Sequence, residues 1–544
     1  MEKVKKIFTL VSKNYFTTSF FVFLIFISYY SCCLSKDFTE VDGPPRCFSV
    51  YHSPKPFIHE NNHLLYPINI YLWNHGISQV LGETKDFLTF GIRSQYMNAF
   101  CMSATISIFY LISVFISKSR LAAALGTLGL GFSKAFILHG TNAAEPVVGL
   151  LWSILSLFLA TCSVRYNVFK YSAALFSGIF LALAMATYQS MVLIGLGILG
   201  ISLISSPENN SSLSFSKGLT FLTGCALGAI FFFGGAYLYD GATSISEILN
   251  RFFALQGGGV YGGFSISKTI NLFMGFVTNQ FLTPQWSGFR YYFKNDFLTL
   301  WTLWILVVGL ISIVFLFLVI KSFLRSKSIN KTLKTAWVLG FTVCLLGPLG
   351  WDPVYDKLWL QPLMLIWFCA LLAWNSGSNF TKYSIVCCAI LTVVPNLFWG
   401  YLRNPVEYKY VQPALETIEQ IKPNDIIVTD WNPITIMAMS VGISNETFPI
   451  ISYAHDNPKG VTEKLIQLLK KAENNKARLI FFGILDQSRE TWDPFLGKRC
   501  GLAYEALENF RSSSITLKRL DYKDISLSVF AIDFQKFNSP KNGS

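Results

Sequence analysis

The feature that most constrains this 544-residue chain is a series of long apolar runs within residues 1–404. A helix needs about 17–25 residues to cross ~30 Å of hydrocarbon. Eleven runs reach or approach that length. They cover 16–34, 96–117, 121–138, 146–163, 171–187, 190–205, 218–239, 298–320, 335–350, 358–374 and 383–400. The sequence therefore predicts a mainly α, polytopic transmembrane fold with about eleven spans.

The stretch 171–205 reads as either one or two spans, because only Ala186–Ser190 interrupts it. Lys and Arg concentrate in short cytoplasmic loops. With eleven spans and the N-terminus inside, the cytoplasmic segments hold 15 basic and two acidic residues, whereas the opposite side of the membrane domain holds 11 and 12. This bias favours two spans here, a cytoplasmic N-terminus and an extracytoplasmic C-terminus in the inner or plasma membrane.

Charge is distributed unevenly along the chain. Only 14% of the residues are charged, against ~25% in soluble domains. Residues 1–404 hold 27 Lys/Arg and 14 Asp/Glu, while residues 405–544 hold 17 of each. The net charge of +13 therefore belongs to the membrane part and is explained by orientation. This excludes a soluble enzyme and a nucleic-acid partner, and it predicts a transmembrane catalytic domain over 1–404 and a soluble domain over 405–544.

The C-terminal residues alternate between strand-like and helix-like patterns. Strands are expected at 425–430, 477–485 and 526–534, and helices at 461–473 and 502–510. Such alternation is typical of a small α/β domain, here on the outer face. Neither G-x-G-x-x-G nor G-x-S-x-G follows any of these strands. We therefore expect a docking or lid domain rather than the catalytic one.

Two further segments are expected on the outer face. The first outer loop, 35–95, contains a stretch from Tyr66 to Gly76 with apolar residues at helical spacing, which predicts an interfacial helix. The second, 240–297, contains the glycine-rich stretch 256–263. It is too polar to span and too long for a simple connector, which predicts a mobile loop over a site.

The residues after the first span carry a pair of carboxylates. Glu40 and Asp42 are two apart, so they share one side of an extended segment, and Gly43-Pro44-Pro45 then turns the chain. With Arg46 close by, the two acids can act as a general base and its orienting neighbour. The alternative is that acids in an aqueous loop are simply solvated.

A histidine pair follows in the same loop. His59 and His63 are four apart with Glu60 between them, which matches H-E-x-x-H. A metalloprotease is discounted, because Asn61 and Asn62 are poor helix residues and no third ligand is identifiable. Hydrogen bonds to phosphate or sugar hydroxyls suit these imidazoles better, and plain loop packing is the alternative.

Other charged residues lie near the expected outer ends of spans. Asp352, Asp356 and Lys357 fall between the ninth and tenth runs, and Glu145 is an outward-facing carboxylate before the fourth. A lysine at a span end usually extends its amine to water, which is the alternative to a substrate role for Lys357. Lys134 falls within a span, so it must face protein or a cavity.

Together these features resemble the GT-C superfamily of integral-membrane glycosyltransferases, of the bacterial type that uses a polyprenyl-phosphate sugar. The resemblance covers the whole chain in architecture, and its residues are Glu40-Val-Asp42, His59–Tyr66 and Tyr355–Pro362. It implies inverting transfer of a hexose or pentose to a glycan, lipid or protein acceptor, with Asp42 as base beside Glu40. The candidate substrate-binding residues are Arg46, His59, His63, Tyr66, Lys134, Glu145 and Lys357.

No dense carboxylate cluster suggests a metal, so we expect metal-independent chemistry without a cofactor. The expected partners are the lipid-linked donor, the acceptor and membrane lipids. Two alternatives remain open. An outer-face glycan ligase or polymerase would use a similar architecture. A lipid-linked sugar flippase or other transporter would be expected to show paired half-repeats, and the sequence shows none.

Overall fold

We describe the chain from a computed structural model. The described residues are 14–34, 47, 50–51, 64–84, 87–166, 169–204, 213–239, 241–248, 266–283, 300–326, 329, 331–350, 352–402, 416–429, 445–450, 453, 457–492, 502–522 and 525–538. The chain forms two compact units. Unit 1 comprises Met1–Ser35 and Ser53–Pro405, and unit 2 comprises Lys36–His52 and Val406–Ser544.

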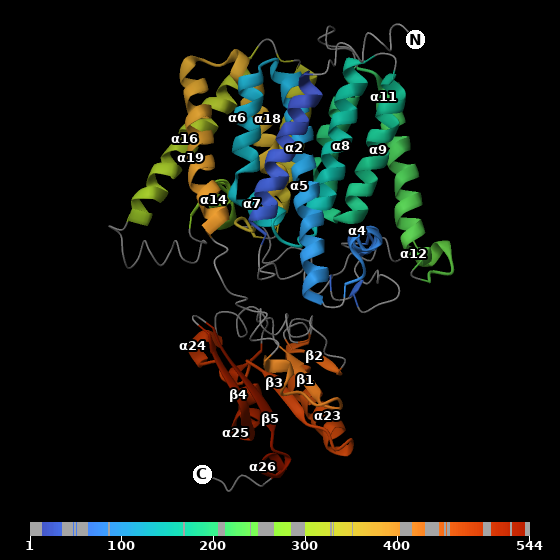
Figure 1. Cartoon of the computed structure of the whole chain (residues 1–544), viewed down its shortest axis with the longest axis vertical. Helices are drawn as coiled ribbons and strands as arrows, with labels where there is room; N and C mark the ends of the chain where they lie inside the picture. The colour runs from blue at the N-terminus through green and yellow to red at the C-terminus, as the bar shows by residue number, and fades with distance from the viewer. Residues whose placement is uncertain are drawn as a thin grey trace. The chain divides into compact units, whose positions relative to one another are not determined.

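Unit 1 is a bundle of apolar helices (Figure 1). Within its described residues, nine helices are long and apolar enough to cross a membrane, or ten if one bent pair is a single span. The elements in chain order are α2 (Asn14–Cys32), α4 (Tyr66–Leu81), α5 (Phe87–Ser117), α6 (Arg120–Gly131), α7 (Lys134–Gly140), α8 (Pro146–Arg165), α9 (Lys170–Thr187), η2 (Gln189–Ile194), α10 (Gly195–Ser202), α11 (Phe215–Ala229), η3 (Ile230–Gly234), α12 (Gly235–Tyr239), α14 (Ile266–Gln280), α16 (Leu300–Arg325), α17 (Lys331–Gly350), η4 (Asp356–Trp359), α18 (Leu360–Ser376) and α19 (Asn379–Leu402). Each predicted run falls on one to three of these consecutive helical elements, so the mainly α, multi-pass membrane fold is confirmed.

Two of the predicted spans are irregular. The run 121–138 is the bent pair α6 and α7, whose axes differ by 63°. The run 190–205 is the short apolar pair η2 and α10, over Gln189–Ser202. Tyr188, with extended backbone at φ −149° and ψ 109°, separates this pair from α9. The stretch 171–205 therefore forms two helical segments, and the assignment of each as a span remains the prediction made from the loop charges.

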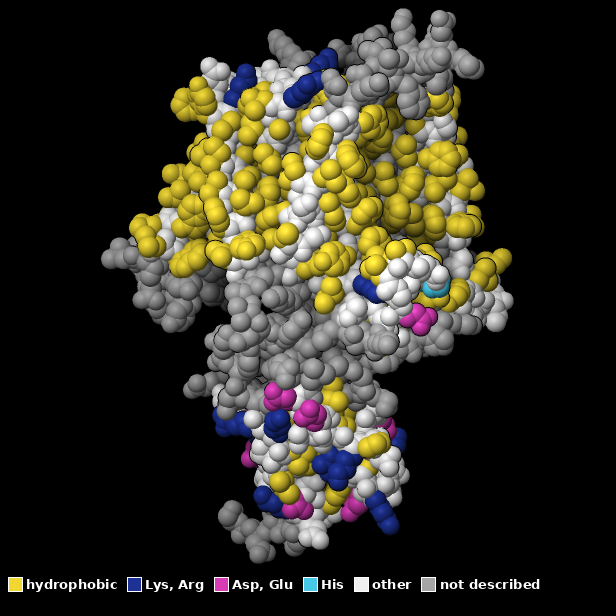
Figure 2. Space-filling model, viewed as in Figure 1, with side chains coloured by type: hydrophobic (Ala, Val, Ile, Leu, Met, Phe, Trp, Pro, Cys, Tyr) yellow, Lys and Arg dark blue, Asp and Glu magenta, His cyan; other side chains and the backbone are white. Residues whose placement is uncertain are grey.

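The surface of unit 1 has the distribution of side chains expected of a membrane protein. Hydrophobic side chains form a broad belt, and the Lys and Arg side chains visible beyond its upper edge lie near helix ends (Figure 2). These features support the multi-pass assignment. Which edge faces the cytoplasm remains the prediction made from the loop charges.

Glycines allow two helices of the bundle to approach closely. A Cβ atom at Gly178 of α9 would collide with the carbonyl oxygen of Phe221, and one at Gly224 of α11 would collide with that of Leu175. In lipid, where no hydrophobic force drives helices together, small residues permit such van der Waals contact. The α9–α11 pair therefore depends on these two positions.

The loop expected over 240–297 differs in part from the structure. Ile266–Gln280 forms the helix α14. Phe276 and Val277 of this helix are buried. This segment was predicted as part of a mobile loop because 240–297 is too polar to span, and the apolar residues at helical spacing within it were overlooked. The segment 256–263 itself lies outside the described residues.

Unit 2 contains a five-stranded sheet in the order β2-β1-β3-β5-β4. Strand β1 pairs in parallel with β2 and β3, whereas β5 pairs antiparallel with β3 and β4. The elements are β1 (Ile426–Thr429), β2 (Thr447–Pro449), η5 (Pro458–Gly460), α23 (Val461–Asn474), β3 (Leu479–Phe482), α24 (Arg489–Trp492), η7 (Tyr504–Leu507), α25 (Glu508–Ser512), β4 (Ser514–Tyr522), β5 (Ile525–Ile532) and α26 (Phe534–Asn538). The expected strands and helices are present.

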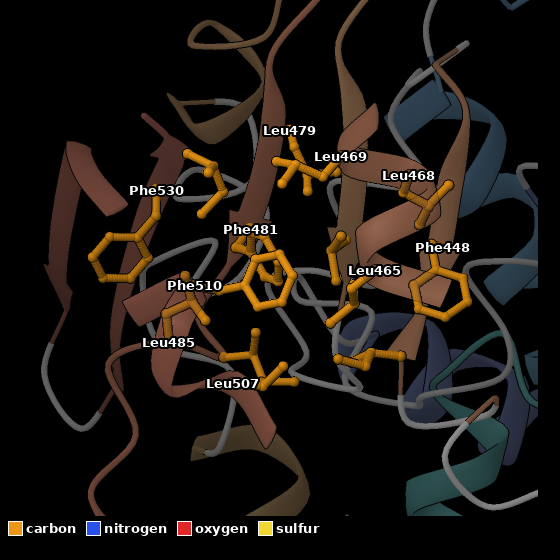
Figure 3. Packing of buried hydrophobic residues seen from close by; sticks show 14 of the residues in the cluster. Phe448, Leu465, Leu468, Leu469, Leu479, Phe481, Leu485, Leu507, Phe510 and Phe530 are labelled. Carbon is orange, nitrogen blue, oxygen red and sulfur yellow. The ribbon is translucent and has the colours of Figure 1, made fainter. Parts of the chain in front are cut away.

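The core of unit 2 lies between the sheet and its helices (Figure 3). Leu465, Leu468 and Leu469 of α23 belong to the same buried cluster as the sheet residues Leu479 and Phe481 (Figure 3). The spacing of these leucines places them on one face of the helix. This core accounts for the folding of the tail as a compact α/β unit.

Strand β4 was not predicted from the sequence. Its pairing with β5 shifts register between Thr516 and Lys518. A bulge of this kind interrupts the alternation of side chains along a strand. The hydrophobic pattern of period two, which revealed β5, is therefore broken in β4.

Candidate functional site

Two short segments of unit 1 bring four ionisable side chains together. The Nζ atom of Lys357 lies 3.6 Å from Glu145 Oε2, with only 3% and 1% of the two side chains exposed. The Nε2 atom of His139 lies 3.2 Å from Asp356 Oδ1. His139 and Glu145 come from the junction of α7 and α8, and Asp356 and Lys357 from η4. We call these four residues the buried charge cluster; His139, Glu145 and Lys357 are buried, and the Asp356 side chain is 30% exposed.

The segment that carries Glu145 is held by α5. Asn98 donates from Nδ2 to the backbone carbonyls of Asn142, at 2.8 Å, and Ala144, at 2.7 Å. Pro146 then begins α8, where its missing N–H group costs no helical hydrogen bond. Glu145 therefore stands at the amino end of a 20-residue helix, where the helix dipole favours a negative charge.

The segment that carries Asp356 and Lys357 rests on α14. Asn279 donates from Nδ2 to the Val354 carbonyl at 3.2 Å. A Cβ atom at Gly275 would collide with the Pro353 carbonyl, so only glycine permits this approach. The Asp356 carboxylate accepts a hydrogen bond from the Lys357 backbone N–H at 2.8 Å. These contacts fix where η4 begins.

Lys134 is anchored beside the cluster by the end of α14. Its Nζ atom donates to the Thr283 carbonyl at 2.8 Å. The Asp356 carboxylate interacts electrostatically with the Lys134 ammonium group. Gln280, three residues before Thr283, donates to Thr392 Oγ1 at 2.8 Å, and its carbonyl accepts from Asn396 at 2.9 Å. These buried bonds fasten the end of α14 to α19. They thereby position the carbonyl that holds Lys134, which faces protein as predicted.

The cluster combines one ammonium group and one imidazole with two carboxylates, and the Lys134 ammonium group lies beside it. Ionisable residues within a membrane bundle are costly and usually functional. Ammonium groups can bind a phosphate, and carboxylates can accept hydrogen bonds from hydroxyl groups. The pairing of Lys357 with Glu145 balances their charges while holding the amine in a defined position. The arrangement therefore suits a ligand that carries both phosphate and hydroxyl groups.

The structure brings together three of the predicted substrate-binding residues, Lys134, Glu145 and Lys357. One expectation about them needs correction, and one alternative is excluded. Glu145 is buried rather than facing solvent, because Asn98 draws its segment against α5. Lys357 is 4% exposed and does not extend to water, because Glu145 provides a counter-charge inside the bundle.

Of the remaining predicted residues, the structure describes Tyr66. Tyr66 is fully buried at the start of α4, and α4 packs against α5. The helix expected from Tyr66 is confirmed and extends to Leu81. The residues that lie outside the described part of the chain are Glu40, Asp42, Arg46, His59 and His63.

His139 was not predicted from the sequence as a functional residue. No motif surrounds it, and its partner Asp356 lies more than 200 residues away. A signal was nevertheless available: His139 and Glu145 both fall in a short polar break between two apolar runs. Among the described residues, no group of three or more His, Cys, Asp or Glu side chains could hold a metal ion.

Comparison with known proteins gave matches only among solved structures. No family model matches the sequence, and no curated protein matches it. ArnT from Cupriavidus metallidurans in the apo state superposes with a TM-score of 0.52 at 11% identity, over 96% of this chain and 99% of that one. ArnT from the same organism bound to undecaprenyl phosphate gives 0.49 at 10% identity, over 98% and 100%.

The archaeal oligosaccharyltransferase AglB from Archaeoglobus fulgidus, in complex with an inhibitory peptide and a dolichol-phosphate, gives a TM-score of 0.48 at 8% identity, over 96% of this chain and 75% of that one. At these identities the likeness concerns the fold, and of these three structures apo ArnT has a TM-score above 0.5. The match extends over nearly the full length of both chains. The protein therefore has the fold of the GT-C membrane glycosyltransferases that its sequence resembles.

Proposed function

We propose that the protein is a membrane glycosyltransferase that moves a sugar from a polyprenyl-phosphate donor to a glycan, lipid or protein acceptor at the outer face of the membrane. The observation that carries this proposal is the buried charge cluster at one end of a bundle with the GT-C fold. A fold alone hosts many functions, so the cluster supplies the chemical part of the argument.

In the proposed reaction, an acceptor hydroxyl oxygen attacks the anomeric carbon of the donor sugar. The bond from that carbon to the phosphate oxygen breaks, and polyprenyl phosphate leaves with the electron pair. Negative charge grows on the phosphate as it departs, and a preorganised cation stabilises it. Lys357 is the proposed phosphate contact, since Glu145 and η4 hold its amine in place.

The acceptor hydroxyl must lose its proton during the attack. On the basis of the sequence resemblance, we assign this proton to the Asp42 carboxylate, with Glu40 as its neighbour. A single displacement of this kind inverts the configuration at the anomeric carbon. Neither step as proposed uses a metal ion.

The test uses purified full-length protein and a polyprenyl-phosphate hexose, and it follows release of the sugar from the lipid. Asp42→Asn keeps the shape of the side chain and removes its basicity, so turnover should fall by ~10²–10⁴-fold. Glu40→Gln should have a smaller effect if Glu40 only orients Asp42. Near-wild-type turnover of Asp42→Asn, at equal protein abundance, would remove Asp42 from the mechanism.

A second set of variants tests the phosphate contact. Lys357→Gln should raise the KM for the donor lipid, and Lys357→Arg should retain part of the activity. Lys331→Gln, at an exposed position of α17, is the control and should leave the donor KM unchanged. If wild type and Lys357→Gln have the same KM for the donor lipid, Lys357 has a purely structural role.

The same preparation distinguishes the alternatives. A flippase would move the intact lipid-linked sugar between leaflets without releasing sugar, and Asp42→Asn would not affect it. A ligase or polymerase would act on a preassembled glycan-lipid and would leave the single-sugar donor unused.

A further inference from the structure

A second polar site lies at the opposite ends of some of the same helices. A cavity of about 480 Å³ opens between the end of α16 and the junction of α18 with α19. Its volume is within the range of small-ligand sites, ~300–1,000 Å³. The residues that line it are Leu318, Lys321, Ser322, Arg325, Ser326, Ser376, Ser378 and Thr381. We call this cavity the α16–α19 pocket.

The pocket is positively charged. Lys321 and Arg325 are four residues apart, so they lie on one face of α16, and no lining residue is acidic. Within the described part of the chain, neither side chain forms an ion pair with a carboxylate. Two cations that share a pocket without a carboxylate provide a site for an anion.

Hydroxyl groups and a helix end complete the lining. Thr381 is 1% exposed, and its Oγ1 atom lies 3.0 Å from Ser322 Oγ and 3.3 Å from Ser378 Oγ. Ser378 Oγ accepts a hydrogen bond from the Thr381 backbone N–H at 3.3 Å. The pocket thus includes the amino end of the 24-residue helix α19, where the helix dipole favours a negative charge.

The surroundings of the pocket are apolar on the membrane side. Leu318 forms part of its wall. Phe317, one turn before Lys321, is 61% exposed, and its ring lies 5.5 Å from Lys321 Nζ. A ligand that bound here by a charged group would have hydrocarbon beside it. This arrangement fits a lipid headgroup better than a freely soluble anion.

We propose that the α16–α19 pocket binds the phosphate headgroup of an anionic membrane lipid, with its acyl chains along α16. Lys321 and Arg325 would contact the phosphate, and the hydroxyls of Ser322 and Ser378 would bond its oxygens or the glycerol. The pocket lies at the edge that the loop charges predict to be cytoplasmic, where anionic lipids attract basic residues. This inference does not depend on the proposed transferase reaction.

The test measures binding of phosphatidylglycerol and phosphatidylcholine to the purified full-length protein by native mass spectrometry. Wild type should bind phosphatidylglycerol more tightly. Lys321→Gln/Arg325→Gln should weaken that binding by about tenfold or more, since each basic residue near a surface contributes ~1 kcal/mol. Lys321→Arg/Arg325→Lys, which keeps both charges, should retain most of the binding. It controls for loss of binding through misfolding of the substituted pocket.

The matched control is Lys118→Gln/Lys331→Gln, which removes two exposed charges from the same predicted side but outside the pocket. It should change the phosphatidylglycerol affinity by no more than about twofold. Equal losses in the pocket and control variants would overturn the proposal, because binding would then follow net charge alone. Equally tight, Lys321-dependent binding of inorganic phosphate would overturn the lipid assignment.

Discussion

Lys357 and Glu145, separated by 212 positions in the sequence, form an ion pair of 3.6 Å with almost no exposure to solvent. The pair joins the start of α8 to η4. It therefore connects two segments that lie far apart in the sequence. A buried pair of this kind contributes less to stability than its geometry suggests, because both charges lose their hydration. Removing one partner alone is much more costly, since the remaining charge stays buried.

We therefore expect Lys357→Met to lower the free energy of unfolding by about 3–5 kcal/mol. Combining it with Glu145→Gln should recover part of this loss, with a coupling of about 1–3 kcal/mol. Unfolding in detergent, followed by fluorescence, measures both. Lys331→Met on the exposed face of α17 is the control and should stay within ~0.5 kcal/mol of wild type. Strictly additive effects would contradict a direct interaction between the two side chains.

The second prediction concerns topology. In a variant without the eleven native cysteines, a cysteine at position 476 in unit 2 should react with a membrane-impermeant reagent in intact cells. A cysteine at position 331 should react only after the cells are permeabilised, because the basic loop around it is predicted to be cytoplasmic. Labelling at 331 in intact cells would reverse the predicted orientation.

The third prediction concerns the close contact of α9 and α11. Gly178→Ala places a methyl group against the Phe221 carbonyl, and overpacking of this kind costs about 1–3 kcal/mol. Gly309→Ala is the control, because nothing lies within 4 Å of the added carbon in α16. The Tm in detergent should fall for Gly178→Ala and stay level or rise for Gly309→Ala. A similar Tm for both variants would show that α9 and α11 separate easily.

The fourth prediction concerns unit 2. Arg478 donates to Asp425 through Nε at 3.1 Å and Nη2 at 2.5 Å, and the carboxylate also accepts from the Lys422 backbone N–H at 2.7 Å. Asp425→Asn should destabilise unit 2 by about 2–3 kcal/mol, because charge-assisted hydrogen bonds are lost at a buried position. Hydrogen exchange of β3 in the full-length protein would report this as faster exchange.

The control for this variant is another ion pair of unit 2. Lys471 and Glu446 lie 2.7 Å apart but are 52% and 45% exposed. An exposed pair contributes about 0–1 kcal/mol, so Glu446→Gln should leave β3 exchange nearly unchanged. Comparable effects of the two substitutions would mean that burial does not set the strength of the Asp425 pair.

Much of the fold follows from local pattern. Long apolar runs form helices because a backbone in lipid must satisfy its own hydrogen bonds, and this identified each spanning segment. The spacing of Leu465, Leu468 and Leu469 likewise predicted α23. Where pattern was interrupted, prediction failed. The bulge in β4 broke its alternation, and α14 followed a glycine-rich stretch that resembled a loop.

The candidate site was likewise predicted only in part from the sequence. Residue type and position relative to the apolar runs, within one for Lys134 and between two for Glu145 and Lys357, were enough to single out these three residues. Which of these side chains form ion pairs was not predictable. An ion pair depends on which segments, distant in the sequence, pack together, and no local sequence pattern specifies that packing. Asn98 and α14 set where Glu145 and Lys357 meet, and the partnership of His139 with Asp356 follows from the same packing. Sequence thus determines which groups the membrane interior must accommodate, and the packing of the helices determines which of them neutralise one another.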